Sequence, residues 1–157
     1  MSDKEFIVMY EKYKNTVYSV ILNYVRNADD ACELSQDTFI KLYTYDDVFA
    51  SDEHVKAWLI RVAINVSKNY LRSRKHVSIS PISEELPVEE QYEIDEVVKE
   101  VMKLPEKYRI PLHLYYYEDY SISEIADILD LPEATMKTRL KRGRDKLRAV
   151  LREEDWV

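Results

Sequence analysis

Positive charge is concentrated near the end of a chain whose formal net charge is −7. Seven of the thirteen residues from Met136 to Arg148 are Lys or Arg, and Asp145 is the only acid among them. In a helix these cations would flank an apolar stripe, so they could hold phosphates on both walls of a DNA groove while the first turns face base edges. The alternative, a solvated amphipathic helix, is disfavoured by the seven-to-one excess of cations. The candidate duplex-binding residues are Thr135, Lys137, Thr138, Arg139, Lys141, Arg142 and Arg144.

A helix-turn-helix is the element expected to position these cations. Ser121 and Glu124 have the spacing of a capping box, which predicts a helix beginning at the next residue after Ser121. Asp130 can adopt the left-handed conformation that ends this helix, and a second helix begins near Pro132. The chain's only glycine, Gly143, is expected where two helices approach most closely. The inner stripe of the second helix comprises Met136, Leu140, Gly143, Leu147 and Leu151.

A second candidate site lies on a helix predicted from about Asp52 to Arg74. At about 100° per residue, its polar side is narrow and basic and lies between apolar sides. Such a face suits an anionic partner, and the alternative is a solvated basic face. Trp58, at the edge of an apolar stripe, is either a core residue or a base-stacking one. The basic stripe comprises Arg61, Asn65, Lys68, Arg72 and Lys75.

Helical periodicity in the rest of the chain predicts an all-α fold. Asp30 with Glu33 resembles a capping box for a second helix, which carries Leu34, Phe39 and Leu42. One glycine and five prolines in 157 residues argue against an all-β protein. Further helices are predicted over residues 3–24, over residues 94–104 and from Pro105 onward. Pro111 is expected to kink or shorten the third of these helices.

The distribution of charge predicts two domains joined by an acidic linker. Residues 1–76 carry 11 basic and 11 acidic residues, and residues 101–157 carry the same numbers. Residues 77–100 carry one Lys and eight acids, so the whole net charge lies there. We therefore expect small helical domains at 1–76 and 94–157, the second containing the helix-turn-helix, with a linker at 77–93.

The composition gives little support to an enzyme, a cofactor or a metal site. Cys32 is the only cysteine, and the three histidines, His54, His76 and His113, are scattered. There is no glycine-rich phosphate loop and no cluster with metal-ligand spacing. No signal peptide or membrane span is recognisable, so a cytoplasmic protein without a small-molecule substrate is expected.

Three segments, in this order, resemble the extracytoplasmic-function sigma factors of bacterial RNA polymerase. "DDACELSQDTFIKLYTY" is similar to their region 2.2, and "AWLIRVAINVSKNYLRSRKH" is similar to regions 2.3 and 2.4. "LPEKYRIPLHLYYYEDYSISEIADILDLPEATMKTRLKRGRDKLR" resembles region 4. The resemblance covers nearly the whole chain, although the family often has Gly where Asp119 and Asp130 stand.

The resemblance implies a dissociable subunit that directs promoter recognition and transcription initiation by core RNA polymerase. The helix-turn-helix would read the −35 element, while the basic stripe with Trp58 and the loop at 44–54 would capture the non-template strand of the −10 element. The partners implied are the β′ clamp helices, the β flap, promoter DNA and an anti-sigma protein, often membrane-bound. The positions that match the family's clamp-docking helix are Leu34, Gln36, Asp37, Phe39 and Leu42.

A second hypothesis is an autonomous helix-turn-helix regulator that binds duplex DNA without polymerase. It would need an apolar face for dimerisation, and no heptad seam is evident outside the two helical domains. It also leaves the basic stripe at 61–75 unexplained.

Overall fold

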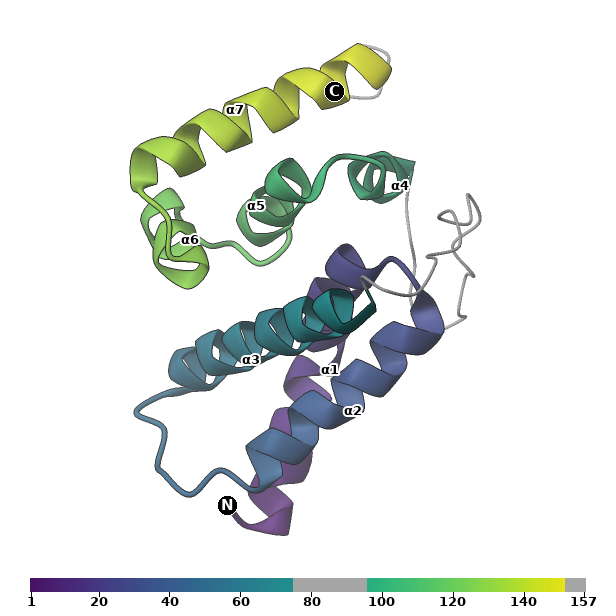
Figure 1. The fold of residues 1–157 in the computed structure, drawn as a ribbon. Helices are drawn as coiled ribbons and strands as arrows, with labels where there is room; N and C mark the ends of the chain where they lie inside the picture. Colours follow the sequence, from purple (N-terminus) through teal and green to yellow (C-terminus); the bar gives the residue numbers. More distant parts are fainter. Residues whose placement is uncertain (75–95, 152–157) are drawn as a thin grey trace. The chain divides into compact units, whose positions relative to one another are not determined.

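The computed structural model describes residues 1–74 and 96–151, which form helices and connecting turns with no β-strand among them. The described residues divide into two compact units, one built from α1–α3 and the other from α4–α7 (Figure 1). The predicted all-α fold with two helical units is therefore confirmed. The predicted linker at 77–93 lies outside the described residues. The helices are α1 Asp3–Val25, α2 Ala28–Tyr43, α3 Asp52–Ser73, α4 Glu96–Met102, α5 Glu106–Tyr116, α6 Ile122–Leu129 and α7 Glu133–Val150.

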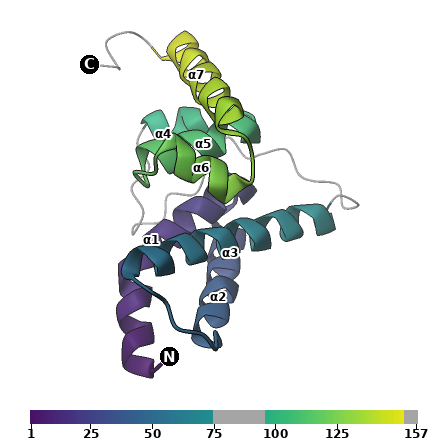
Figure 2. The ribbon, with the colours of Figure 1, turned by 90° about the vertical axis from the view of Figure 1, so that its left-hand side faces the viewer.

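The first unit is a three-helix bundle in which α3 crosses α1 and α2 (Figure 2). Its core consists of apolar side chains that recur at helical spacing on the inner face of each helix. Ser2 caps α1 through a capping box with Glu5, so the helix begins at the predicted residue, Asp3. The largest of its completely buried residues include Val17, Ile21, Leu42, Leu59 and Ile60.

The start of α2 differs from its prediction. Asn27 is the N-cap, and its side-chain oxygen accepts a hydrogen bond of 3.0 Å from the backbone N–H of Asp30. Asp30 instead lies in the first turn, where its carboxylate accepts a bond of 3.2 Å from Arg74 Nη1. The capping box of Asp30 with Glu33 was therefore a wrong prediction. Arg26, with φ 54°, reverses the chain one residue before Asn27, which places the amide side chain at the helix start.

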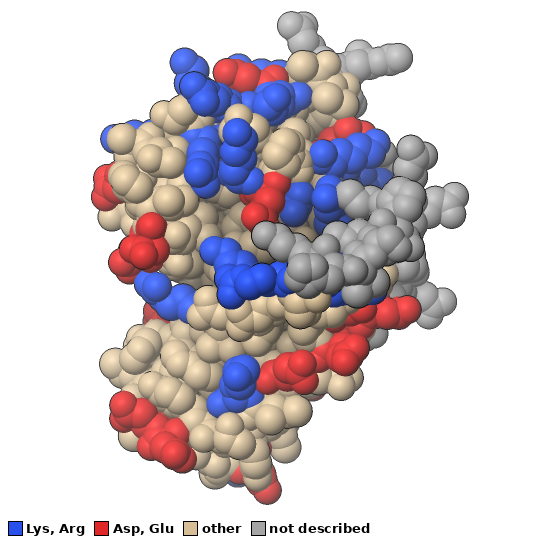
Figure 3. All heavy atoms as spheres, in the orientation of Figure 1, with Lys and Arg blue, Asp and Glu red and all other residues tan. Residues whose placement is uncertain are grey.

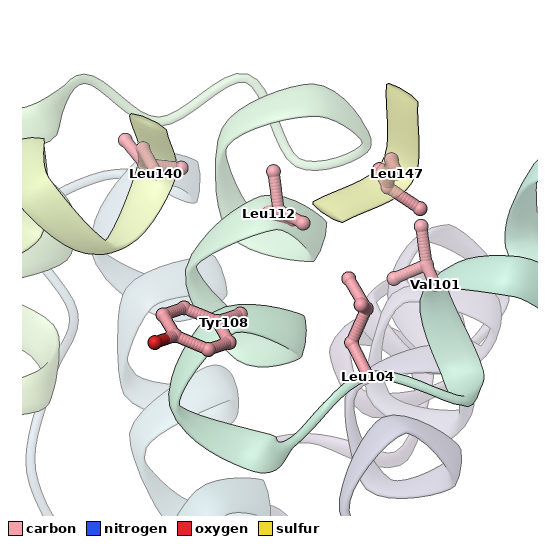
Figure 4. Close-up of a cluster of buried hydrophobic side chains, with 6 residues drawn as sticks. All are labelled: Val101, Leu104, Tyr108, Leu112, Leu140 and Leu147. Atoms are coloured by element: carbon pink, nitrogen blue, oxygen red, sulfur yellow. The ribbon is translucent and has the colours of Figure 1, made fainter. Parts of the chain in front are cut away.

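The second unit is packed around the crossing of α5 and α7. The side chains of its core cluster come from α4, the turn after it, α5 and α7 (Figure 4). Pro111 lies inside α5 and is buried, and the helix continues beyond it to Tyr116. The cluster comprises Val101, Leu104, Tyr108, Leu112, Leu140 and Leu147.

Gly143 lies where α7 packs tightly against α5. A Cβ atom built at Gly143 would lie 2.9 Å from Leu112 Cδ1 and 3.4 Å from Tyr108 Cβ. The first distance is too short for carbon atoms in contact, which prefer about 3.5–4.0 Å, whereas the second is at the near edge of ordinary contact. The chain's only glycine therefore lies at a close approach of two helices, and the missing Cβ atom lets α7 pack against α5 there.

The helix-turn-helix is formed by α6 and α7, as predicted. The Ser121 hydroxyl accepts a bond of 3.1 Å from the Glu124 N–H, and the Glu124 carboxylate accepts one of 3.0 Å from the Ser121 N–H. Asp130 ends α6 in the left-handed conformation, with φ 55° and ψ 51°. The turn that follows directs the chain into α7 at Glu133.

Alanine at position 130 is expected to destabilise the helix-turn-helix, whereas glycine is not. A Cβ atom in the left-handed region costs roughly 1–2 kcal/mol, and Asp offsets part of this through local hydrogen bonding that Ala lacks. We expect Asp130→Ala to lower the unfolding free energy by about 1 kcal/mol, and Asp130→Gly to leave it unchanged or raise it. Hydrogen exchange of the α6 and α7 amides measures both variants, and equal stability of the two would contradict the argument.

Candidate nucleic-acid interface

The outward face of α7 is the strongest candidate for binding DNA. Its inner side is occupied by the predicted stripe, in which Met136, Leu140, Gly143 and Leu147 are buried. The cations therefore fall on the remaining surface, and Lys and Arg side chains gather over α7 in Figure 3. Among the predicted residues, Lys137, Thr138, Lys141 and Arg142 are exposed, while Thr135, Arg139 and Arg144 are half-buried.

Arg144 differs from the other cations of α7 because it is held by a neighbouring helix. Its Nη1 atom donates a hydrogen bond of 3.3 Å to the hydroxyl of Tyr116, at the end of α5. This bond is the main cause that raises the pKa of Arg144 above its usual range, and burial only partly opposes it. Arg144 therefore supplies fixed charge at the flank of α7 and also ties α7 to α5.

Thr138 lies on the outermost line of α7, opposite the buried stripe. Its hydroxyl donates a bond of 3.0 Å to the carbonyl oxygen of Ala134, within the same helix. The donor is thus satisfied, and the lone pairs of the oxygen and the methyl group remain available. Such a side chain can accept a hydrogen bond from the amino group of a base, or contact the methyl group of a thymine.

The first turns of α7 also form one wall of a cleft of about 410 Å³ within the second unit. Thr135, Thr138, Arg139 and Arg142 line that wall. The opposite wall belongs to the first turn of α5, and sequence reasoning did not predict its contribution. The spacing of residues along α7 carries no information on where α5 crosses it.

The basic stripe of α3 is exposed in the first unit, as a nucleic-acid face requires. Arg61, Asn65, Lys68 and Arg72 are all exposed and lie opposite the buried side of the helix. An ion pair between Arg74 and Asp30 holds the end of α3 against the start of α2. Arg72 is the last residue but one of α3 and is therefore close to this ion pair. The remaining member of the predicted stripe, Lys75, lies outside the described residues.

The loop before α3 folds its aromatic residues around Trp58. The Trp58 ring centroid lies 4.9 Å from that of Tyr45 and 5.6 Å from that of Phe49. His54 Nδ1 accepts a hydrogen bond of 3.1 Å from the Ala50 N–H, which closes the loop onto the first turn of α3. Trp58 is only half-buried, so part of its side chain is exposed to solvent.

The predicted docking residues on α2 fall into two groups. Leu34, Phe39 and Leu42 are buried in the core of the first unit, with exposed fractions of 8%, 4% and 0%. Only Gln36 and Asp37 are exposed. The three apolar residues therefore support α2 rather than face a partner.

Two exposed apolar residues on α2 were not predicted as docking residues. Ile40 is 61% exposed and Tyr43 is 47% exposed. The Tyr43 hydroxyl donates a bond of 2.7 Å to Asp3 Oδ1, which raises the pKa of Tyr43 and fixes its ring against α1. Ile40 lies three residues after Asp37 on α2, so the two exposed side chains are neighbours on the surface of the helix.

Within the described ranges, no group of His, Cys, Asp and Glu side chains could hold a metal ion. His113 is buried, with Nε2 3.6 Å from a carboxylate oxygen of Glu118, and it packs inside the second unit. No described helix combines the length and apolar character needed to cross a membrane.

Comparison with known proteins identifies both units. Residues 9–77 match the family described as Sigma-70 region 2, and residues 94–147 match Sigma-70, region 4. ECF RNA polymerase sigma factor SigW of Bacillus subtilis (strain 168) is 30% identical over 167 residues, covering 94% of this chain and 89% of the relative. ECF RNA polymerase sigma factor SigM of the same organism is 33% identical over 153 residues, covering 90% and 92%.

The fold is also that of a solved sigma factor. RpoE of Bartonella quintana, whose structure was solved with the anti-sigma factor NepR, matches with a TM-score of 0.75 at 20% identity. The match covers 93% of this chain and 96% of RpoE. The two family matches and the relatives from Bacillus subtilis show that the chain belongs to the ECF family of RNA polymerase sigma factors.

Proposed function

We propose that the two units divide promoter recognition between them, α3 reading the −10 element and α7 reading the −35 element. The observation that carries this proposal is the pair of exposed cationic faces on separate units. In this proposal the chain supplies binding and positioning, while core polymerase supplies the chemistry.

The face of α7 suits duplex DNA. Cations flank a central line of small and polar residues that includes Ala134 and Thr138. A helix with this profile fits the major groove, which is about 12 Å wide, and its flanking cations reach phosphates on both walls. Base contacts would come from the early turns, in which Thr135, Thr138 and Arg139 lie.

The face of α3 and its preceding loop suit single-stranded DNA. Trp58, Tyr45 and Phe49 form a compact aromatic group beside the exposed Arg61. A base stacked on an aromatic ring contributes about 1–3 kcal/mol, which offsets the few kcal/mol of unstacking an extruded base. The stripe from Arg61 to Arg72 would then follow the backbone of the captured strand.

The surface of α2 is proposed to dock on the β′ clamp helices. Its contact residues are Gln36, Asp37 and Ile40, because their side chains are exposed on one stretch of the helix. The β flap is proposed to contact the second unit. An anti-sigma protein is a further proposed partner, in keeping with the solved complex of RpoE with NepR. These partners place the activity in the cytoplasm, where core polymerase works.

The decisive test mixes the purified protein with core RNA polymerase and genomic DNA fragments. Transcripts from a discrete set of start sites, produced only when both proteins are present, are the expected result. Tight, specific binding to duplex DNA by the protein alone, without any effect on initiation by core, would overturn the proposal in favour of an autonomous regulator.

Asp37→Asn is expected to weaken binding to core polymerase about fivefold while leaving the fold intact, because an exposed charge pair contributes up to about 1 kcal/mol to an interface. Competition with a labelled sigma factor for core measures the affinity. Asp46→Asn removes an exposed carboxylate from the loop before α3 and serves as the matched control. Unchanged affinity in Asp37→Asn, or an equal loss in both variants, would contradict the docking assignment.

A further inference from the structure

The loop that joins α2 to α3, residues 44–51, is exposed at its tip. Asp46, Asp47 and Val48 are all exposed, and the exposed fraction of Val48 is 86%. Both ribbon views show this loop at the end of the first unit where α1 begins (Figure 1 and Figure 2). An exposed tip gains little support from packing, so the contacts at the two ends of the loop decide how it is presented.

The end of the loop that leads into α3 is held by two side chains of α1. The hydroxyl of Tyr13 donates a hydrogen bond of 3.0 Å to the carbonyl oxygen of Asp52, the first residue of α3. Lys12 Nζ donates one of 2.7 Å to the Asp52 carboxylate, and this bond is the main cause that raises the pKa of Lys12. Tyr13 is 6% exposed, so the core of the unit fixes its ring. The backbone and the side chain of Asp52 are thus both tied to α1.

The end of the loop that follows α2 is held by the same helix. The Tyr43 hydroxyl donates a bond of 2.7 Å to Asp3 Oδ1, and the Tyr43 ring packs edge-on against Phe6, with ring centroids 5.2 Å apart. Asp3 precedes Lys12 by nine residues, so at 1.5 Å per residue the two attachments lie about 14 Å apart along α1. One helix therefore sets the span that the loop bridges.

A loop that is already fixed captures a base at lower cost. A flexible loop must be ordered when its ligand binds, and this ordering opposes binding. The aromatic group of Trp58, Tyr45 and Phe49 draws two of its members from this loop. Holding Asp52 in place therefore holds the aromatic group in the arrangement that receives DNA.

We propose that Tyr13 and Lys12 are positioning residues that preset this loop for capture of the non-template strand. Neither contacts DNA in this proposal, since both act through Asp52. The inference rests on the proposed function of α3 and deepens it. It assigns a part in base capture to α1, a helix that carries none of the residues proposed to contact DNA.

The first arm of the test measures capture directly. The full chain is bound to core polymerase and titrated with a labelled single strand that carries the non-template −10 sequence. Tyr13→Phe removes only the hydroxyl and is expected to weaken this binding about fivefold, the effect of one typical hydrogen bond, while the affinity for core polymerase stays unchanged. Tyr10→Phe is the matched control, because it removes a hydroxyl from an exposed tyrosine of the same helix and should leave strand binding unchanged.

The second arm separates positioning from direct contact with DNA. If Lys12 held a phosphate, Asp52→Ala would strengthen strand binding by removing a nearby negative charge. If Lys12 acts through Asp52, Lys12→Gln and Asp52→Ala should each weaken binding up to about fivefold, and the double variant should lose no more than either single one. Lys14→Gln, whose side chain pairs with Glu11 within α1, is the matched control and should bind like the unmodified protein.

Salt dependence adds a second measurement on Lys12. Each phosphate contact with a single strand contributes about 0.7 to the slope of log K against log salt, so a positioning residue leaves the slope unchanged. A smaller slope in Lys12→Gln, or tighter strand binding in Asp52→Ala, would overturn the inference.

A third arm excludes a merely structural role. The Ala50 amide donates to His54 Nδ1 in the loop, and its hydrogen exchange should become faster in Tyr13→Phe while exchange in α1–α3 stays unchanged. Discrimination against a strand with the wrong base at the captured position should also fall, because a looser loop adapts to either base. Unchanged strand binding in Tyr13→Phe, an equal loss of affinity for core polymerase, or faster exchange throughout α1–α3 would each overturn the inference.

The variant Arg61→Gln with Lys68→Gln separates this inference from the function on which it rests. Both side chains are exposed on α3, so the fold is expected to tolerate the change. If that variant loses strand binding while Tyr13→Phe behaves like the unmodified protein, only the role of α1 is wrong. If that variant retains full strand binding, the role of α3 itself is wrong.

Discussion

Replacing Arg139 and Lys141 with alanine is expected to lower promoter-dependent transcription at least about 30-fold while leaving the affinity for core polymerase unchanged. The two side chains lie on opposite flanks of the Thr138 line, so together they face both walls of a groove. Loss of one base or phosphate contact costs about 1–3 kcal/mol, and the two losses should add because the side chains share no partner.

Two measurements on the same preparations check this expectation. Run-off transcription from a promoter gives the activity, and competition for core gives the docking affinity. Lys99→Ala with Lys103→Ala removes the same charge from the same unit and should retain activity, since neither residue lies on α7. An equal fall in the affinity for core polymerase would show that it is wrong to assign DNA binding to α7 and polymerase docking to α2. An equal loss of transcription in the control would show that only net charge matters.

Gly143→Val is expected to destabilise the second unit by about 3 kcal/mol or more, which is the upper range for overpacking a well-filled core. The first added atom would already lie 2.9 Å from Leu112 Cδ1 and 3.2 Å from Leu112 Cγ. Leu112 is 2% exposed and surrounded by the core cluster, so it has little room to move. Gly143→Ala should cost less, because alanine favours a helix interior over glycine by about 1 kcal/mol.

Hydrogen exchange of the α7 amides in the full chain measures the effect on this unit alone. Ala149→Val, at an exposed position of the same helix, is the matched control and should cost only about 0.5 kcal/mol. Combining Gly143→Ala with Leu112→Ala should destabilise by at least about 1 kcal/mol less than the sum of the single changes, because the second change opens the space that the first needs. Strict additivity would contradict the close contact between positions 143 and 112.

Features that depend on neighbouring residues in the chain were predictable from the sequence. The capping box of Ser121 with Glu124 and the left-handed Asp130 involve groups within a few residues of each other. The buried stripe of α7 follows from helical periodicity, and the role of Gly143 follows from its lack of a Cβ atom.

Features that depend on packing between helices were not predictable in the same way. By local chemistry, either Asn27 or Asp30 could be the N-cap of α2. The left-handed conformation of Arg26 places Asn27 in that role. A family resemblance indicates which positions correspond, but it does not say which of their side chains are exposed. The predicted docking residues therefore included the buried Phe39 together with the exposed Asp37. Lys107 and Arg142 line one cleft because of where α5 crosses α7, and no local pattern encodes that crossing.

The two units have separate cores, and this separation has a genetic consequence. A substitution that unfolds α4–α7 leaves the core of α1–α3 intact, including the surface of α2 around Asp37. Such a protein is expected to keep occupying core polymerase without directing it to promoters. In a cell that also makes the undamaged protein, the two would compete for a limited pool of polymerase. Mutations in the second unit should therefore behave as dominant inhibitors, whereas mutations that unfold the first unit should be recessive.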